Sequence, residues 1–123
     1  MTRAGATLAE DLLLTADRLL SSRIGATAAG RHRGASLALR TSLEIAVDHV
    51  LDAAVPGLDG VSVRAKLLCL RSYTATETAR RASAVWSHLC LGCHYHQYEM
   101  GPTRAQVQYW RGEVGELVEL LLI

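Results

Sequence analysis

Histidine and cysteine, two residue types that bind metals and move protons near neutral pH, are concentrated in residues 88–100 (HLCLGCHYHQYEM) of this 123-residue chain. This segment holds three of the five histidines and two of the three cysteines. Any chemical site of the protein is therefore expected in this segment or beside it.

Two metal-site interpretations compete with a structural one. Cys90, Cys93 and His94 match the CxxCH pattern of c-type haem attachment, and the same side chains are suitable zinc ligands. On a helix, Cys90 and His94 share one side, whereas His96 points about 120° away from Cys90. One helix therefore offers two or three ligands, and no second CxxC pair completes a tetrahedron. The structural alternative, cysteines packed as small apolar side chains, is favoured, and no cofactor is expected.

The composition is typical of a single soluble domain, residues 1–123. Half of the residues are apolar, a fifth are charged, and the net charge is +1. No apolar run approaches the roughly 20 residues that a membrane span requires, and no secretory leader is recognised. An odd number of cysteines fits a reducing compartment. These features predict a cytoplasmic protein that does not associate with membranes.

Start and stop signals divide the chain into four long helices and one short helix. A second helix is expected from about Ala35 and ends before Pro56, because proline blocks helix continuation. Ser62 is the expected cap of a short helix. Capping boxes predict three further helix starts, at Thr7, Thr74 and Thr103. The predicted fold is all-α, an antiparallel four-helix bundle with one additional short helix.

Two apolar surfaces are candidates for pairing with a second copy. One is the stripe on the helix expected from about residue 35 to residue 55, and the other is the leucine-rich residues 120–123. A closed two-fold dimer is the commonest way to bury such surfaces, so a homodimer is expected. The alternative is that both surfaces belong to the core of the monomer.

The end of the histidine-rich segment carries a family resemblance. His96-Gln97-Tyr98, followed by a short break and a Trp-containing last helix with a leucine-rich tail, resembles the HEPN superfamily, particularly its minimal nucleotidyltransferase-associated toxin branch. The family motif is Arg, four residues, His, any residue, Tyr. The resemblance implies a helical homodimer in a toxin–antitoxin setting, with RNA cleaved without metal by Arg and His at the dimer cleft. Here Leu91 stands at the arginine position, which implies weak or no ribonuclease activity.

A looser form of that motif allows up to six residues between arginine and histidine, and Arg81 with His88 satisfies it. Seven positions place these two side chains two turns apart on one helical face, ~10 Å along the axis. The candidate catalytic residues are therefore His96, Tyr98, His88 and Arg81. An exposed basic stripe without catalytic function is the alternative explanation of the Arg81–His88 spacing.

Several arginines outside the segment are candidates for phosphate contacts. Arg31 and Arg33 lie in an expected basic loop, residues 30–34, while Arg80 and Arg104 lie closer to the histidine-rich segment. These residues predict a module associated with nucleic acid or nucleotide. The alternative function is a small accessory protein that binds a protein partner and whose His/Cys residues are structural. A zinc-binding bundle is the third hypothesis.

Overall fold

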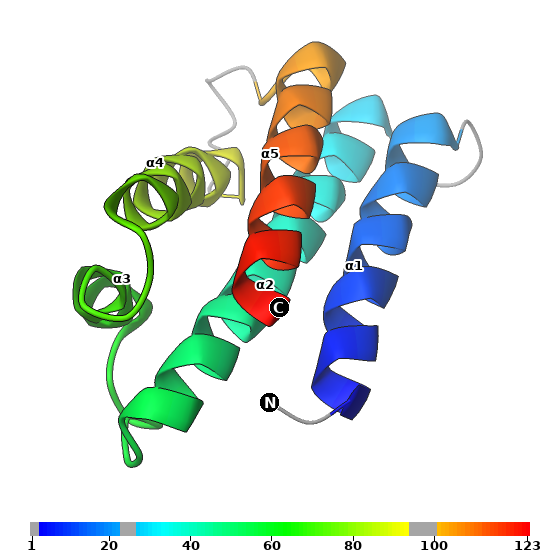
Figure 1. The fold of residues 1–123 in the computed structure, drawn as a ribbon. Coiled ribbons are helices and arrows are strands. Elements are labelled where there is room, and N and C mark those ends of the chain that lie inside the picture. The colour runs from blue at the N-terminus through cyan, green and yellow to red at the C-terminus, as the bar shows by residue number, and fades with distance from the viewer. Residues whose placement is uncertain (1–2, 23–26, 94–100) are drawn as a thin grey trace.

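The computed structural model of the protein describes residues 3–22, 27–93 and 101–123, and these residues form five α-helices without a β-strand (Figure 1). The predicted all-α class is confirmed for this part of the chain. The helices are α1 (Arg3–Ser21), α2 (Ala28–Ala54), α3 (Val63–Leu70), α4 (Thr76–Cys93) and α5 (Arg104–Leu122). None of them is long and apolar enough to cross a membrane.

The longest helix, α2, occupies the centre of the fold and packs against each of the other four helices. In Figure 1, α1 and α5 lie along α2, whereas α3 and α4 run across this layer and are seen nearly end-on. Leu39, Leu43 and Leu51 of α2 are fully buried. The prediction that this apolar stripe faces a second copy is therefore wrong, because the stripe is covered by the other helices of the same chain.

The start of α2 differs from the sequence-based prediction. Thr27 caps the helix through its side-chain oxygen, which accepts a hydrogen bond from the backbone N–H of Gly30. Gly34 lies inside the helix, where a Cβ would be 3.3 Å from Cδ1 of Leu19 on α1. This glycine permits close packing of two helices rather than a turn. The predicted basic loop is therefore wrong, and Arg31 lies on the first turn of α2.

Two predicted helix caps are confirmed. The side chain of Ser62 accepts a hydrogen bond from Ala65 N at the start of α3. Thr103 and Gln106 form the complete capping box of α5, in which each side chain accepts a hydrogen bond from the other residue's backbone N–H. Each of these caps depends only on residues within a single helical turn. The predicted end of the second helix before Pro56 is also confirmed.

Of the other two predicted helix starts, the one near Thr7 is wrong and the one near Thr74 is confirmed to within two residues. Helix α1 begins at Arg3 rather than near Thr7, because the alanine-rich residues before Thr7 continue the helix towards the N-terminus. Helix α4 begins at Thr76, two residues after Thr74. The carboxylate of Glu77, expected to complete the Thr74 box, binds an arginine one turn along α4 instead.

The last turn of α4 meets both α2 and α5 closely. A Cβ added at Gly92 would lie 2.9 Å from Ser36 Oγ of α2 and 3.1 Å from Cζ3 of Trp110 on α5. Glycine is therefore needed where three helices converge. This junction fixes the end of α4, and with it the orientation of the two faces that α4 presents to α3 and α5.

Candidate functional site

The residues predicted to be functional divide into those that the structure describes and those that it does not. His94, His96 and Tyr98 fall between residues 93 and 101, outside the described residues. Arg81, His88 and Leu91 lie on α4. The remaining predicted arginines are on three helices: Arg31 and Arg33 on α2, Arg80 on α4 and Arg104 at the start of α5.

Arg81 and His88 line the same small groove between α4 and α5, as their spacing predicts. The groove encloses about 170 Å³, and Tyr109 and Trp110 of α5 form its opposite wall. His88 is exposed and stacks on Trp110, with ring centroids 6.1 Å apart and planes inclined by 16°. The structure thus brings an arginine and a histidine to one surface, backed by aromatic rings.

The guanidinium of Arg81 is already occupied by carboxylates of α5. Its Nε and Nη2 donate to the two carboxylate oxygens of Glu113, at 3.0 and 2.6 Å, and Nη2 also donates to Glu116. Hydrogen bonding to Glu113, and then to Glu116, raises the pKa of Arg81 above its ordinary value. The same contact with Arg81 lowers the pKa of Glu113. A bidentate pair of this kind holds the guanidinium in a fixed orientation.

The α4–α5 groove therefore offers little positive charge to an anion. Arg80, next in the chain, is bound to Glu77 through Nε and Nη2. A phosphate approaching Arg81 would be repelled by two carboxylates, and displacing either of them would leave that carboxylate without its partner. Leu91, three residues beyond His88, is 75% exposed and supplies no charge. In this arrangement Arg81 joins α4 to α5 rather than presenting its charge to a substrate.

A second groove lies on the opposite side of α4, and its arginines differ from Arg81 in their partners. It lies between α3 and α4 and encloses about 250 Å³. It is lined by Arg64 of α3, by Arg71 at the C-cap of α3, and by Trp86, Ser83 and Ser87 of α4. Within the part of the chain that the structure describes, neither of these arginines forms an ion pair. We call this feature the α3–α4 groove.

The aromatic wall of the α3–α4 groove is held in place by polar contacts. Trp86 is half-buried, and its indole N–H donates to Glu44 of α2 across 3.5 Å. The guanidinium carbon of Arg64 lies 5.5 Å from the centroid of the Trp86 ring, a cation–π arrangement. Arg64 is therefore oriented by an aromatic face instead of by a carboxylate, so its hydrogen-bonding capacity is retained for a ligand.

The chain segment that forms this groove has more basic than acidic side chains. Residues 61–93 contain five basic side chains and a single acidic one, Glu77. The basic residues are Arg64, Lys66, Arg71, Arg80 and Arg81. Lys66 is bound to Asp48 of α2 at 2.8 Å, which attaches α3 to α2. The uncompensated charge of the segment therefore belongs to Arg64 and Arg71, which line the groove.

Sequence reasoning missed Arg64, Arg71 and Trp86. One signal was available: the two arginines are seven positions apart, at the start and at the C-cap of a short helix without acidic residues, so they share a face. The partner of that face is not evident from the sequence, because α3 and α4 pack together only in the folded chain. Arg31, Arg33 and Arg104, which were predicted, line neither groove.

The cysteines carry little indication of metal chemistry in the described residues. Cys69, Cys90 and Cys93 are free thiols, and burial raises the pKa of Cys93. A raised pKa disfavours the thiolate, which is the form that binds zinc. Across residues 3–22, 27–93 and 101–123, no three histidine, cysteine or carboxylate side chains cluster as a metal site would require. His94, the third residue of the CxxCH pattern, is outside these ranges.

Two candidate sites thus lie on different sides of α4. The groove that faces α5 has arginines paired with carboxylates, whereas the groove that faces α3 has arginines without an ion pair in the described residues. Comparison with known proteins finds no family model, no curated protein and no solved structure that matches this chain, so the functional argument rests on the geometry of these two grooves.

Proposed function

We propose that this protein is a helical module that binds single-stranded RNA through the α3–α4 groove and has weak or no ribonuclease activity. The observation that carries the proposal is the pair of arginines, Arg64 and Arg71, that line one groove without a carboxylate partner in the described residues. Phosphates supply most of the affinity in nucleic-acid complexes, and they need guanidinium groups that are not already neutralised.

The shape of the groove favours a strand over a single phosphate ion. Arg64 lies in the first turn of α3 and Arg71 is its C-cap, seven residues later, so their backbones are ~10 Å apart along the helix axis. Two separate phosphates of one strand suit that spacing. Between them, a base can stack on the guanidinium plane of Arg64, which already lies over Trp86. Hydroxyls of Ser83 and Ser87 line the α4 side and are suited to contacts with sugar or phosphate oxygens.

Weak or absent cleavage follows from the state of Arg81. A metal-independent ribonuclease needs a cation that stabilises the charge on the scissile phosphate beside a histidine that moves protons. Arg81 lies in the same groove as His88, but its charge is compensated by Glu113 and Glu116. We therefore assign Arg81 a role in joining α4 to α5.

The resemblance to HEPN proteins remains part of the hypothesis. It implies a homodimer with His96 and Tyr98 facing a cleft between subunits, and the helix signals of the sequence predict an antiparallel four-helix bundle with one additional short helix. Leu91 occupies the arginine position of the motif. If that cleft cleaves RNA, a residue other than Leu91 must supply the cation, and His96→Ala would abolish the activity.

Fluorescence anisotropy of a labelled single-stranded RNA tests the binding proposal. The double variant Arg64→Gln/Arg71→Gln is expected to bind at least about tenfold more weakly than wild type. It should also lower the slope of log affinity against log salt by about 1.4, because about 0.7 counterions are released per phosphate of a single strand. The matched control is Arg18→Gln, which removes one charge from an exposed site on α1.

Two results would contradict the proposal. One is a loss of affinity for Arg18→Gln as large as that for the double variant, which would indicate a diffuse charge effect. The other is unchanged RNA binding by the double variant. Cleavage is measured in parallel on the same RNA, and rapid cleavage by wild type that His88→Ala or His96→Ala removes would contradict weak or absent ribonuclease activity.

A further inference from the structure

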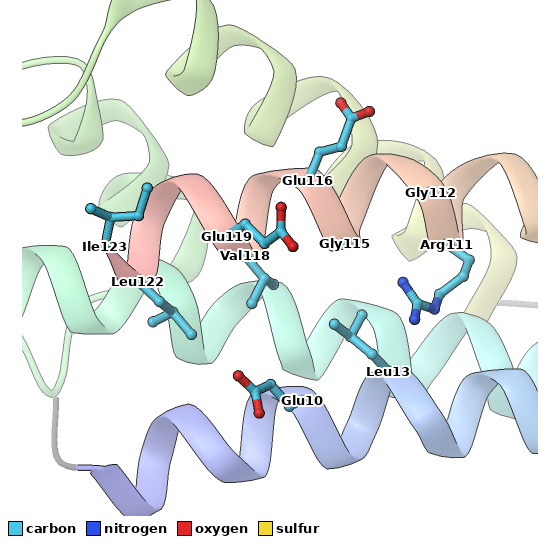
Figure 2. A pocket seen from close by; sticks show the side chains of 10 residues that line it. All are labelled: Glu10, Leu13, Arg111, Gly112, Gly115, Glu116, Val118, Glu119, Leu122 and Ile123. Carbon is cyan, nitrogen blue, oxygen red and sulfur yellow. The ribbon is translucent and has the colours of Figure 1, made fainter.

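A groove larger than either of the two beside α4 lies between α1 and α5. It encloses about 720 Å³. Figure 2 shows Leu13 of α1 and Val118 and Leu122 of α5 pointing into it, which gives the groove an apolar floor. Leu13 and Val118 are buried, whereas Leu122 is half-buried. Since α1 packs mainly on α2 and touches α5 less, the groove is open along the two helices.

Two glycines of α5 keep the groove open. A Cβ at Gly112 would meet nothing within 4 Å, and a Cβ at Gly115 would meet only the flexible end of Arg111. Glycine inside a helix is unfavourable compared with alanine, so two such residues in the middle of α5 cost stability. They leave space where ordinary side chains would fill the groove.

The charges that border the groove are mainly negative. Glu10 lies on the α1 side and Glu119 on the α5 side, and neither forms an ion pair among the described residues. Glu116 points away from α1 in Figure 2, consistent with its pairing with Arg81. The single cation that lines the groove, Arg111, is held by Asp17 at 2.9 Å. An apolar floor is thus bordered on both sides by carboxylates that form no ion pair within the described ranges.

We infer that the α1–α5 groove is a docking site for a cationic amphipathic helix of a partner protein. The apolar face of such a helix would cover Leu122 and the floor, while its lysine or arginine side chains would reach Glu10 and Glu119. Helix-in-groove recognition uses apolar anchors at helical spacing in this way. A helix laid between α1 and α5 would pack on two neighbours at once, which is the arrangement of helices within a bundle.

Charge complementarity favours this occupant over a second copy of the chain. In a two-fold interface, the same patch of each subunit meets its own copy. Glu10 and Glu119 of one subunit would then approach Glu10 and Glu119 of the other, and like charges brought together are repulsive. A partner helix with basic residues turns the same carboxylates into attractive contacts.

The test uses two designed helical peptides that carry leucine along one face and differ on the other face, which is lysine in the first peptide and glutamate in the second. Binding of each to the full chain is measured by anisotropy. Wild type is expected to bind the lysine peptide at least about tenfold more tightly than the glutamate peptide. The variant Glu10→Lys/Glu119→Lys should reverse this preference. The control Asp11→Lys, an exposed neighbour that does not line the groove, should keep it.

A second series tests the position of the peptide independently of charge. Gly112→Phe places a ring in the open groove, and it is expected to weaken binding of the lysine peptide by at least about tenfold. Gly112→Ala should weaken it less, because a methyl group fills little of the groove. Circular dichroism and thermal unfolding of each variant verify that the helices are retained.

Three results would overturn the inference. Equal affinity of wild type for both peptides would remove the role of charge complementarity. Full binding by a folded Gly112→Phe variant would place the peptide elsewhere. Sedimentation showing a wild-type dimer that Gly112→Phe converts to a monomer would make the groove an interface between copies. None of these outcomes depends on RNA binding by the α3–α4 groove.

Discussion

The two sides of α4 show how differently arginine is used on one helix. On the side that faces α5, Arg81 is bound by two carboxylates, and His88 stacks on Trp110. On the side that faces α3, Arg64 lies over Trp86, and no carboxylate of the described chain pairs with it or with Arg71. The first side holds the fold together, whereas the second retains charge that a ligand can use.

The difference has a simple physical basis. A bidentate ion pair occupies two of the five N–H donors of a guanidinium and compensates its charge, so a competing anion is also repelled by the carboxylate already bound. A cation–π contact leaves the donors at the edge of the guanidinium available. The number of arginines near a groove is therefore a weaker indicator of anion binding than the identity of their partners.

The largest expected difference between the two sides of α4 is in the free energy of unfolding that is lost when a packed residue is replaced. Replacing Gly92 with valine should lower the free energy of unfolding by about 1–3 kcal/mol, because its Cβ would meet Ser36 and the rigid Trp110 ring. Replacing Ser87, on the α3 side, with alanine should change it by less than about 0.5 kcal/mol. Urea unfolding measures both values. Equal losses would show that the α3 side is packed as closely as the junction at Gly92.

The next largest difference in the free energy of unfolding is expected when an arginine on each side of α4 is replaced. Arg81→Met is expected to cost about 1–2 kcal/mol, because Glu113 and Arg81 are only 21% and 24% exposed and the carboxylate loses its partner. Arg71→Met should cost less than about 0.5 kcal/mol, since no ion pair is lost. A double-mutant cycle of Arg81→Met with Glu113→Gln isolates the pair, and a coupling energy near zero would remove its structural role.

The pH dependence of that pair follows from the lowered pKa of Glu113. Hydrogen bonding from Arg81 lowers this pKa below its ordinary value of 4.5 in the folded state. The carboxylate therefore binds protons more readily when unfolded, and its stabilising contribution is complete above about pH 4.5 and lost as the pH falls through the lowered pKa. The stability difference between wild type and Arg81→Met should be constant at neutral pH and shrink below pH ~4.5. A difference that grows on acidification would contradict this assignment.

A modest effect on stability should accompany a clear effect on RNA binding. Arg64→Gln removes an exposed cation–π contact and should cost about 0.5–1 kcal/mol of stability. The same change should weaken RNA binding several-fold, whereas Arg81→Met should leave RNA affinity within about twofold of wild type. Anisotropy on the folded variants makes this comparison. A larger loss of affinity for Arg81→Met than for Arg64→Gln would reverse the roles assigned to the two sides of α4.

Much of the fold was predictable because its signals are local. Ser62, Thr103 and Pro56 mark helix boundaries through hydrogen bonds or steric limits within one turn of chain, and all three predictions are confirmed. Local signals fail where a glycine has a packing function. Gly34 suggested a loop, but it permits close contact with Leu19, which is 15 residues away in sequence and on another helix.

The candidate site was less predictable, because a charged residue acquires its role from distant partners. The sequence alone determined that the chain is helical and that Arg81 and His88 share a helical face. Only the tertiary structure decided that Arg81 is neutralised, since its partner Glu113 is 32 residues away and is brought near by the packing of α4 on α5. The same packing left Arg64 and Arg71 without carboxylates. Helix formation depends on neighbours within a few residues, whereas the availability of a charge depends on which helices meet.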